Sequence, residues 1–92
     1  MRTFVIIFPL SSTQINGSKK AVAEIIEDFG KRNVKVREGN DEDAISFALE
    51  CNKVLSTSEL DDITKISDRY DCVSIFVNID KDSFPKHLVF NL

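Results

Sequence analysis

The pattern of apolar and polar positions opens with a stretch that is apolar at both alternating sets of positions. The stretch runs from Thr3 to Leu10, and its two sets are Phe4, Ile6, Phe8 and Leu10 on one side, and Val5 and Ile7 on the other. Strands in the middle of a sheet are covered on both faces, so this pattern predicts a central strand. Pro9 has no amide to donate, and we expect strand pairing to weaken there.

The next periodic segment, from Lys19 to Phe29, has the spacing of an amphipathic helix. Its apolar positions are Val22, Ile25, Ile26 and Phe29. Ser18 stands directly before the segment and is a suitable N-cap residue, because its hydroxyl can accept a hydrogen bond from a free amide. Gly30 follows the segment, where a residue with positive φ commonly ends a helix.

Two short alternating segments, 34–37 and 44–51, are separated by a polar run. The run, Glu38-Gly39-Asn40-Asp41-Glu42, has the composition of a turn. In the second segment Ile45, Phe47, Leu49 and Cys51 alternate with Ala44, Ser46, Ala48 and Glu50. Two alternating segments joined by a Gly-Asn turn predict a β-hairpin.

The clearest helix start in the sequence is Ser56 followed by Glu59, which form a capping box. Leu55 and Leu60 flank it at the spacing of a hydrophobic staple. The apolar stripe that follows consists of Leu60, Ile63, Ile66 and Tyr70. A last alternating segment, Cys72 to Ile79, predicts a strand with Val73, Ile75, Val77 and Ile79 on one face.

The order of these elements is βαββαβ, which predicts an α/β protein of the ferredoxin-like type, an α+β sandwich. In this fold an antiparallel sheet with strand order 4-1-3-2 carries both helices on one face, and the first strand is central. Cys51 would end the third strand and Cys72 would begin the fourth, parallel one, so they should lie at opposite edges of the sheet, too far apart for a disulfide. We expect one domain over residues 1–92, with 80–92 as a C-terminal tail or added strand.

Composition narrows the class of protein. The chain has 92 residues, 42% of them hydrophobic, which suits one globular domain. Its formal net charge of -3 is not that of a protein that binds nucleic acid mainly by releasing counterions. The apolar stretch at the start is too short to span a bilayer, so we expect a cytoplasmic protein with reduced thiols and no membrane partner.

No complete catalytic or metal-binding motif is present, so the sequence predicts no enzyme, no catalytic residue, no metal and no cofactor. The single histidine, His87, has no nucleophile turn near it. Asp80-Lys81-Asp82 pairs two carboxylates without the spacing of a calcium loop. Gly17-Ser18-Lys19 matches only a fragment of a phosphate-binding loop. We interpret all three as ordinary turn, loop or surface residues, and the two cysteines as small buried hydrophobic residues.

The only basic cluster consists of Lys31, Arg32, Lys35 and Arg37, on the turn into the second strand and along it. Such side chains can contact phosphates. They also fit an edge strand that carries charge to prevent aggregation, which we favour because the whole chain is acidic. Nucleic acid is therefore the second-ranked partner.

A contact surface is predicted on the sheet face that the helices leave uncovered. If Phe4, Ile6 and Phe8 face the helices, Val5, Ile7 and Phe76 lie on that face, beside Ala44, Ser46 and Ala48. Exposed apolar patches of this kind mark interfaces. The tail, with Leu88 and Phe90, is also too apolar to be left in water and belongs to the same predicted interface.

The order and lengths of the elements from Thr3 to Ile79 resemble the SinR-like proteins and the small nuclease-fold family of CRISPR spacer acquisition. This resemblance implies a ferredoxin-like fold and a dimer formed through the sheet and a C-terminal strand. The family usually has a metal-binding aspartate at the end of the first strand. This sequence has Phe8-Pro9-Leu10 there, so we carry over no catalytic residue.

The function that these observations favour is a non-enzymatic protein-interaction module, a small acidic adaptor or inhibitor that binds a protein partner and forms a homodimer. A protein encoded by a phage or mobile element, acting against a host defence system, is one concrete form. One alternative is a nucleic-acid-binding or nuclease-like protein that uses the basic cluster. Another is a small-ligand regulatory domain, for which no residue identifies the ligand.

Overall fold

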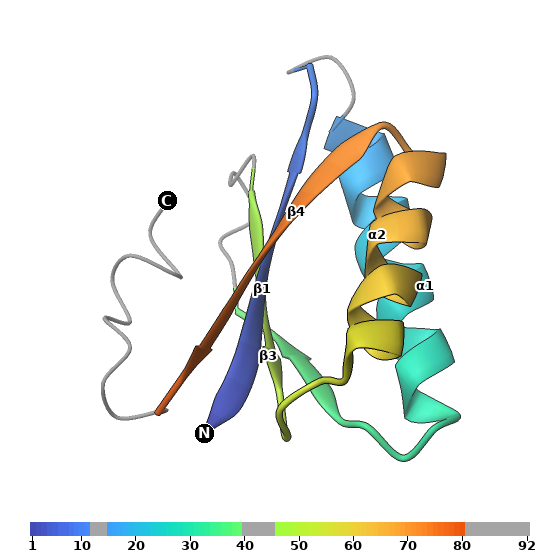
Figure 1. The fold of residues 1–92 in the computed structure, drawn as a ribbon. Coiled ribbons are helices and arrows are strands. Elements are labelled where there is room, and N and C mark those ends of the chain that lie inside the picture. The colour runs from blue at the N-terminus through green and yellow to red at the C-terminus, as the bar shows by residue number, and fades with distance from the viewer. Residues whose placement is uncertain (12–14, 40–45, 81–92) are drawn as a thin grey trace.

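The computed structural model describes residues 1–11, 15–39 and 46–80, which form an α+β structure (Figure 1). The elements follow in the order β1 (Arg2–Pro9), α1 (Ile15–Gly30), β2 (Val36–Glu38), β3 (Phe47–Cys51), α2 (Thr57–Arg69) and β4 (Cys72–Ile79). This is the predicted order of strands and helices. The predicted second and third strands are shorter here and their bounds are shifted, and residues 40–45 lie outside the described part of the chain.

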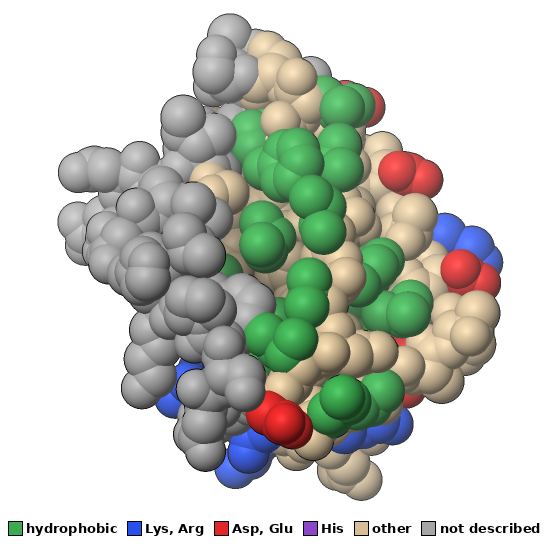
Figure 2. All heavy atoms as spheres, turned by 60° about the vertical axis from the view of Figure 1, so that its left-hand side comes forward, with side chains coloured by type: hydrophobic (Ala, Val, Ile, Leu, Met, Phe, Trp, Pro, Cys, Tyr) green, Lys and Arg blue, Asp and Glu red, His purple; other side chains and the backbone are tan. Residues whose placement is uncertain are grey.

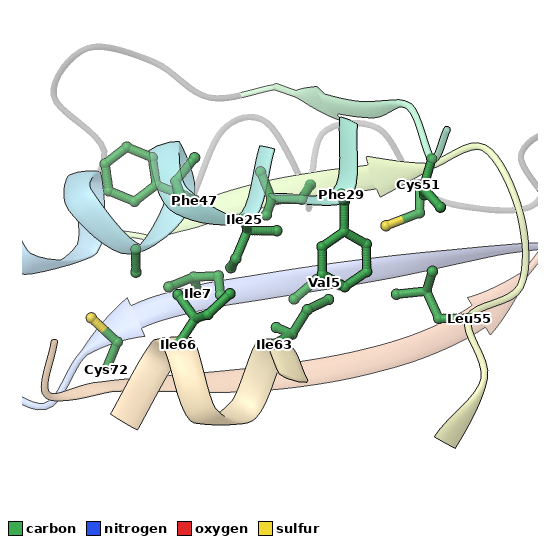
Figure 3. Packing of buried hydrophobic residues seen from close by; sticks show 14 residues of the cluster. Val5, Ile7, Ile25, Phe29, Phe47, Cys51, Leu55, Ile63, Ile66 and Cys72 are labelled. Carbon is green, nitrogen blue, oxygen red and sulfur yellow. The ribbon is translucent and has the colours of Figure 1, made fainter. Parts of the chain in front are cut away.

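The four strands form one antiparallel sheet in the order β2-β3-β1-β4, which is the predicted 4-1-3-2 read from the opposite edge. β1 is central, and all eight of its residues pair with β4, from Arg2↔Ile79 to Pro9↔Cys72. The weakening of the ladder expected at Pro9 therefore does not shorten the pairing. β3 and β4 run parallel on either side of β1, so Cys51 and Cys72 lie at opposite ends of the sheet, both free and buried, as predicted (Figure 3).

Both helices cover the same face of the sheet (Figure 1), and the core lies between them and the strands (Figure 3). Its largest side chains with almost no exposed area are Val5, Ile7 and Leu49 from the sheet, Ile25 and Phe29 from α1, and Ile63 from α2. Side chains alternate along a strand, so Phe4, Ile6 and Phe8 are on the other face. Our expectation for the two faces of β1 was wrong: they are exchanged.

α1 begins three residues earlier than its predicted N-cap. Ser18 lies inside the first turn of the helix, where it is fully buried, and does not precede it. Gly17 is also helical, and a Cβ atom added there would lie 2.7 Å from the carbonyl oxygen of Tyr70, at the end of α2. Glycine at this position therefore allows the start of one helix to approach the end of the other.

The end of α1 also differs from the prediction. Gly30 is the last helical residue and has no positive φ. The left-handed residue is Asn33, with φ 62°, within a turn in which Val34 donates a backbone hydrogen bond to Phe29. Asparagine tolerates this conformation better than most residues, because its short side chain can hydrogen-bond locally. The chain therefore reverses at Asn33 and enters β2.

The start of α2 confirms the predicted capping box. The Glu59 amide donates to Ser56 Oγ at 3.2 Å, and the Ser56 amide donates to Glu59 Oε1 at 2.8 Å. Leu55 is buried in the core, and Leu60 packs against the same cluster. The Leu55 amide donates to Thr3 Oγ1, which fixes the entry to α2 against the first strand.

Candidate functional site

The face of the sheet opposite α1 and α2, which we call the outer face, is predominantly apolar. The strand register assigns to it Arg2, Phe4, Ile6 and Phe8 of β1, Ala48 and Glu50 of β3, Arg37 of β2, and Val73, Ile75, Val77 and Ile79 of β4. Cross-strand partners in an antiparallel ladder point to the same side, so these side chains form one continuous surface. Figure 2 shows hydrophobic side chains gathered on this side of the molecule.

Exposure varies across the outer face. Ile75, in the edge strand β4, is the most exposed of its apolar residues, at 46%. Ile6, Phe8 and the other apolar residues of β4 are half-buried. Phe4 has only 5% of its surface exposed. The accessible apolar surface is therefore concentrated along β4 and the adjoining part of β1.

One end of the outer face carries a carboxylate between two guanidinium groups. Glu50 is 5% exposed, and its Oε2 accepts from Arg2 Nη1 at 3.2 Å. Its other oxygen, Oε1, lies 2.5 Å from Arg37 Nη2. The three residues stand on three neighbouring strands, so the ion pairs tie β2, β3 and β1 together. They also neutralise a buried charge that would otherwise be costly.

The predicted interface residues of the sheet do not lie on the outer face. Val5 and Ile7 have no exposed surface and belong to the core, and Phe76, which pairs with Val5, packs against the same core. The prediction for these three residues was wrong because the two faces of β1 were exchanged. The other predicted interface residues, Leu88 and Phe90, lie outside the described residues. Ala48 is on the outer face as expected.

The predicted basic cluster is largely paired with carboxylates. Arg32 bridges Asp28 and Asp62, both at 2.7 Å, and its guanidinium lies 4.8 Å from the centre of the Phe29 ring. Lys31 lies 3.7 Å from Glu27, and Arg37 is held by Glu50 as described above. Lys35 is exposed. Because three of the four cations already have partners, the geometry does not favour phosphate binding by this cluster.

A groove of about 420 Å³ between α1 and α2 is lined almost entirely by charged side chains. Its acidic residues are Glu24, Glu27, Asp28 and Asp62, and its basic residues are Lys31, Arg32, Lys65 and Arg69. The two signs balance, and several of these residues are joined in pairs, such as Arg69 with Glu24 at 2.6 Å. These ion pairs therefore tie the two helices together. The lining of the groove carries no net charge that would attract a charged ligand.

The two thiols are placed for packing. Burial, together with the nearby carboxylates of Glu59 and Glu50, raises the pKa of Cys51 to about 11. Cys72 Sγ lies 3.3 Å from the Tyr70 carbonyl oxygen, to which it donates, and 3.5 Å from the hydroxyl of buried Ser18. Neither thiol is in the partly exposed, electropositive surroundings that activate a cysteine.

The other candidate sites show no arrangement for phosphate or metal binding in the part of the chain that is described. Gly17-Ser18-Lys19, expected in a loop, lies inside α1. Among the described residues, no group of three or more histidine, cysteine, aspartate or glutamate side chains is placed to hold a metal ion. Lys81, Asp82 and His87 lie outside those residues. No helix in the described ranges is both long and apolar enough to cross a membrane.

Comparisons with known proteins give no relative. No protein-family model, no curated protein and no solved structure matches this chain. Of the surfaces described above, the outer face combines exposed apolar area with a defined strand register, and it is the candidate functional site.

Proposed function

We propose that this chain is a non-enzymatic protein-interaction module of the ferredoxin-like class, which forms a homodimer and uses the outer face of its sheet as contact surface. The observation that carries this proposal is the apolar outer face, with Ile75 46% exposed at its most accessible point. Apolar patches of this kind on soluble domains mark binding surfaces.

The size of the chain supports self-association. A domain of 92 residues buries a smaller fraction of its surface on folding than a larger one, so a dimer interface adds apolar burial that one copy lacks. The outer face carries only three charged residues in its described part, Arg2, Arg37 and Glu50, and they are paired with one another at one end. Contact between two copies of the apolar region therefore brings no unpaired charge out of water.

The test is the solution mass, measured by size-exclusion chromatography with light scattering over a range of concentrations. We expect a dimer that dissociates on dilution. Ile75→Lys should shift the chain to the monomer, because it places an ammonium group in the apolar contact surface. The matched control is Thr64→Lys, which adds the same charge at an exposed position on α2, on the opposite side of the sheet.

A monomer at all concentrations would contradict the homodimer. A dimer that Ile75→Lys leaves intact, in a variant with an unchanged circular dichroism spectrum, would show that the contact surface lies elsewhere than on the outer face.

A further inference from the structure

The two edges of the sheet are protected to very different degrees. β2 forms one edge with three residues, two of them charged, Arg37 and Glu38. β4 forms the other edge with eight residues, Cys72–Ile79, and contains no charged residue and no proline. Long, uncharged edge strands are templates for pairing with a further strand, and natural proteins normally block them. The sequence of β4 contains neither of two common protections of an edge strand, a charged residue or a proline.

The backbone groups that β4 presents at this edge follow from the ladder with β1. The Leu10 amide donates to the Asp71 carbonyl oxygen at 3.0 Å, one step beyond the pair Pro9↔Cys72. Hydrogen-bonded pairs alternate in an antiparallel ladder, so Val73, Ile75, Val77 and Ile79 bond to β1. The residues between them, Cys72, Ser74, Phe76 and Asn78, direct their amide and carbonyl groups to the edge that no strand of the described residues pairs with.

We propose that the edge of β4 pairs antiparallel with β4 of a second copy of this chain, about a two-fold axis at Ile75. This inference rests on the proposed homodimer, and it limits the contact to the margin of the outer face along β4, where Val73, Ile75 and Val77 lie. In this register Cys72 bonds to Asn78 of the second copy, and Ser74 bonds to Phe76. All four outward-directed residues then have a hydrogen-bonding partner, and the two four-stranded sheets become one continuous sheet.

The chemistry of β4 matches a second copy of itself. Antiparallel pairing of the strand brings no like charges opposite each other, since Cys72–Ile79 carries none. Ile75 lies opposite Ile75 of the second copy, and Val73 lies opposite Val77, all on the outer face. The two apolar rows of β4 thus become neighbours, and Ile75, the most exposed of them, packs beside its own copy.

Cysteine cross-linking tests this geometry in the full chain. Ile75 and its copy form a non-hydrogen-bonded pair, in which the two Cα atoms are about 4.5 Å apart, within the range of a disulfide. We expect Ile75→Cys to convert to a disulfide-linked dimer under mild oxidation, with a doubled mass on a non-reducing gel. Wild type, whose own thiols Cys51 and Cys72 are buried, should remain unlinked.

Two further variants separate this arrangement from others. Val73→Cys stands on the same face of β4, but its copies would be about 13 Å apart, four residues along the strand, so it should not cross-link. Ile6→Cys, which pairs with Ile75 from the neighbouring strand β1, should also remain unlinked, because three strand spacings separate its copies. Efficient linking of Ile6→Cys would show outer faces stacked on each other, which overturns the edge pairing but leaves the proposed function intact.

Amide exchange of the unmodified protein gives an independent measurement. The amides of Ser74, Phe76 and Asn78 should exchange more slowly as protein concentration rises, while those of Val73 and Ile75 should be protected throughout. Fast exchange of the first three amides at every concentration overturns the proposal. A light-scattering mass of one chain overturns the homodimer as well, whereas a dimer with fast-exchanging Ser74, Phe76 and Asn78 overturns the edge pairing alone.

Discussion

At the scale of single residues, the two helices approach each other closely at Gly17. Its Cα faces the backbone carbonyl of Tyr70, and a Cβ atom would lie 2.7 Å from that oxygen. A backbone atom cannot move aside as the end of a flexible side chain can. Glycine is a poor helix former, so its presence in the first turn of α1 is explained by this contact and not by helix propensity.

We expect Gly17→Ala and Gly30→Ala to change stability in opposite directions. Gly17→Ala should lower the free energy of unfolding by about 1–3 kcal/mol, because the helices must separate. Gly30→Ala should raise it by up to about 1 kcal/mol, since alanine favours the helix and no atom lies within 4 Å of the added Cβ. Urea denaturation of both variants measures the difference, and equal stability of Gly17→Ala and wild type would contradict the close contact.

Residue-level prediction from the sequence succeeded where the signal was local and failed where it came from packing. Ser56 and Glu59 satisfy each other's amides, so their spacing alone identified the helix start. Ser18 and Gly30 are also of residue types that commonly cap helices, yet both lie within α1. The helix begins before Ser18, where Gly17 approaches Tyr70, and it ends at Gly30 itself, because the left-handed residue of the following turn is Asn33. Neither contact nor turn conformation can be seen in the local sequence.

At the scale of elements, the start of α2 is stabilised by charge as well as by hydrogen bonds. The hydrogen bond from the Ser56 amide lowers the pKa of Glu59, and the Ser56 hydroxyl and the Lys53 ammonium act in the same direction. A carboxylate with a lowered pKa in the folded state stabilises the fold above its unfolded pKa. That contribution is lost as pH falls through the folded pKa.

We therefore expect Glu59→Gln to be less stable than wild type by about 0.5–1 kcal/mol at neutral pH, because glutamine keeps the hydrogen bond but not the charge. The difference should shrink as pH falls below the ordinary glutamate pKa of about 4.3. Thermal denaturation of both proteins from pH 7 to pH 3 tests this. A difference that stays constant over that range would mean that the charge of Glu59 contributes nothing.

The pairing of strands explains why the two faces of β1 were exchanged in the sequence-based prediction. Both sets of positions in β1 are apolar, so alternation alone does not say which set faces the helices. The answer depends on the register with β3, in which Val5 pairs with Leu49 and Ile7 pairs with Phe47. Register is set by the whole sheet, and no local signal in β1 carries it.

At the scale of the whole molecule, element order and sheet order follow from periodicity, because each apolar face must find a covered position in the same small domain. The outer face, in contrast, could be anticipated as a kind of surface but not by its residues. The ion pairs of the outer face could not be predicted from the sequence either, because Glu50 lies between Arg2 and Arg37 only once three strands are aligned. The sequence therefore predicted the kind of candidate site, an apolar sheet face, but it assigned the wrong sheet residues to that face.

The two thiols report on the integrity of both ends of the sheet. Cys51 and Cys72 are each almost fully buried, and burial raises the pKa of Cys51 to about 11. We expect iodoacetamide at pH 8 to modify neither in the native protein and both in urea, with a midpoint at the global unfolding transition. Mass spectrometry measures this, and selective labelling of one thiol below that midpoint would reveal local opening at its end of the sheet.

The pairing of β1 with β4 has a consequence for the rate of folding. The ladder joins Arg2 to Ile79, so the centre of the sheet is completed only when residues far apart in sequence meet. Contacts between residues so far apart in sequence stabilise the chain only after a long loop has been closed. Proteins rich in such contacts fold slowly for their size. We expect the β2–β3 hairpin and the helices to order first. The docking of β4 would then be the rate-limiting step, during which β1 lacks a partner along one edge.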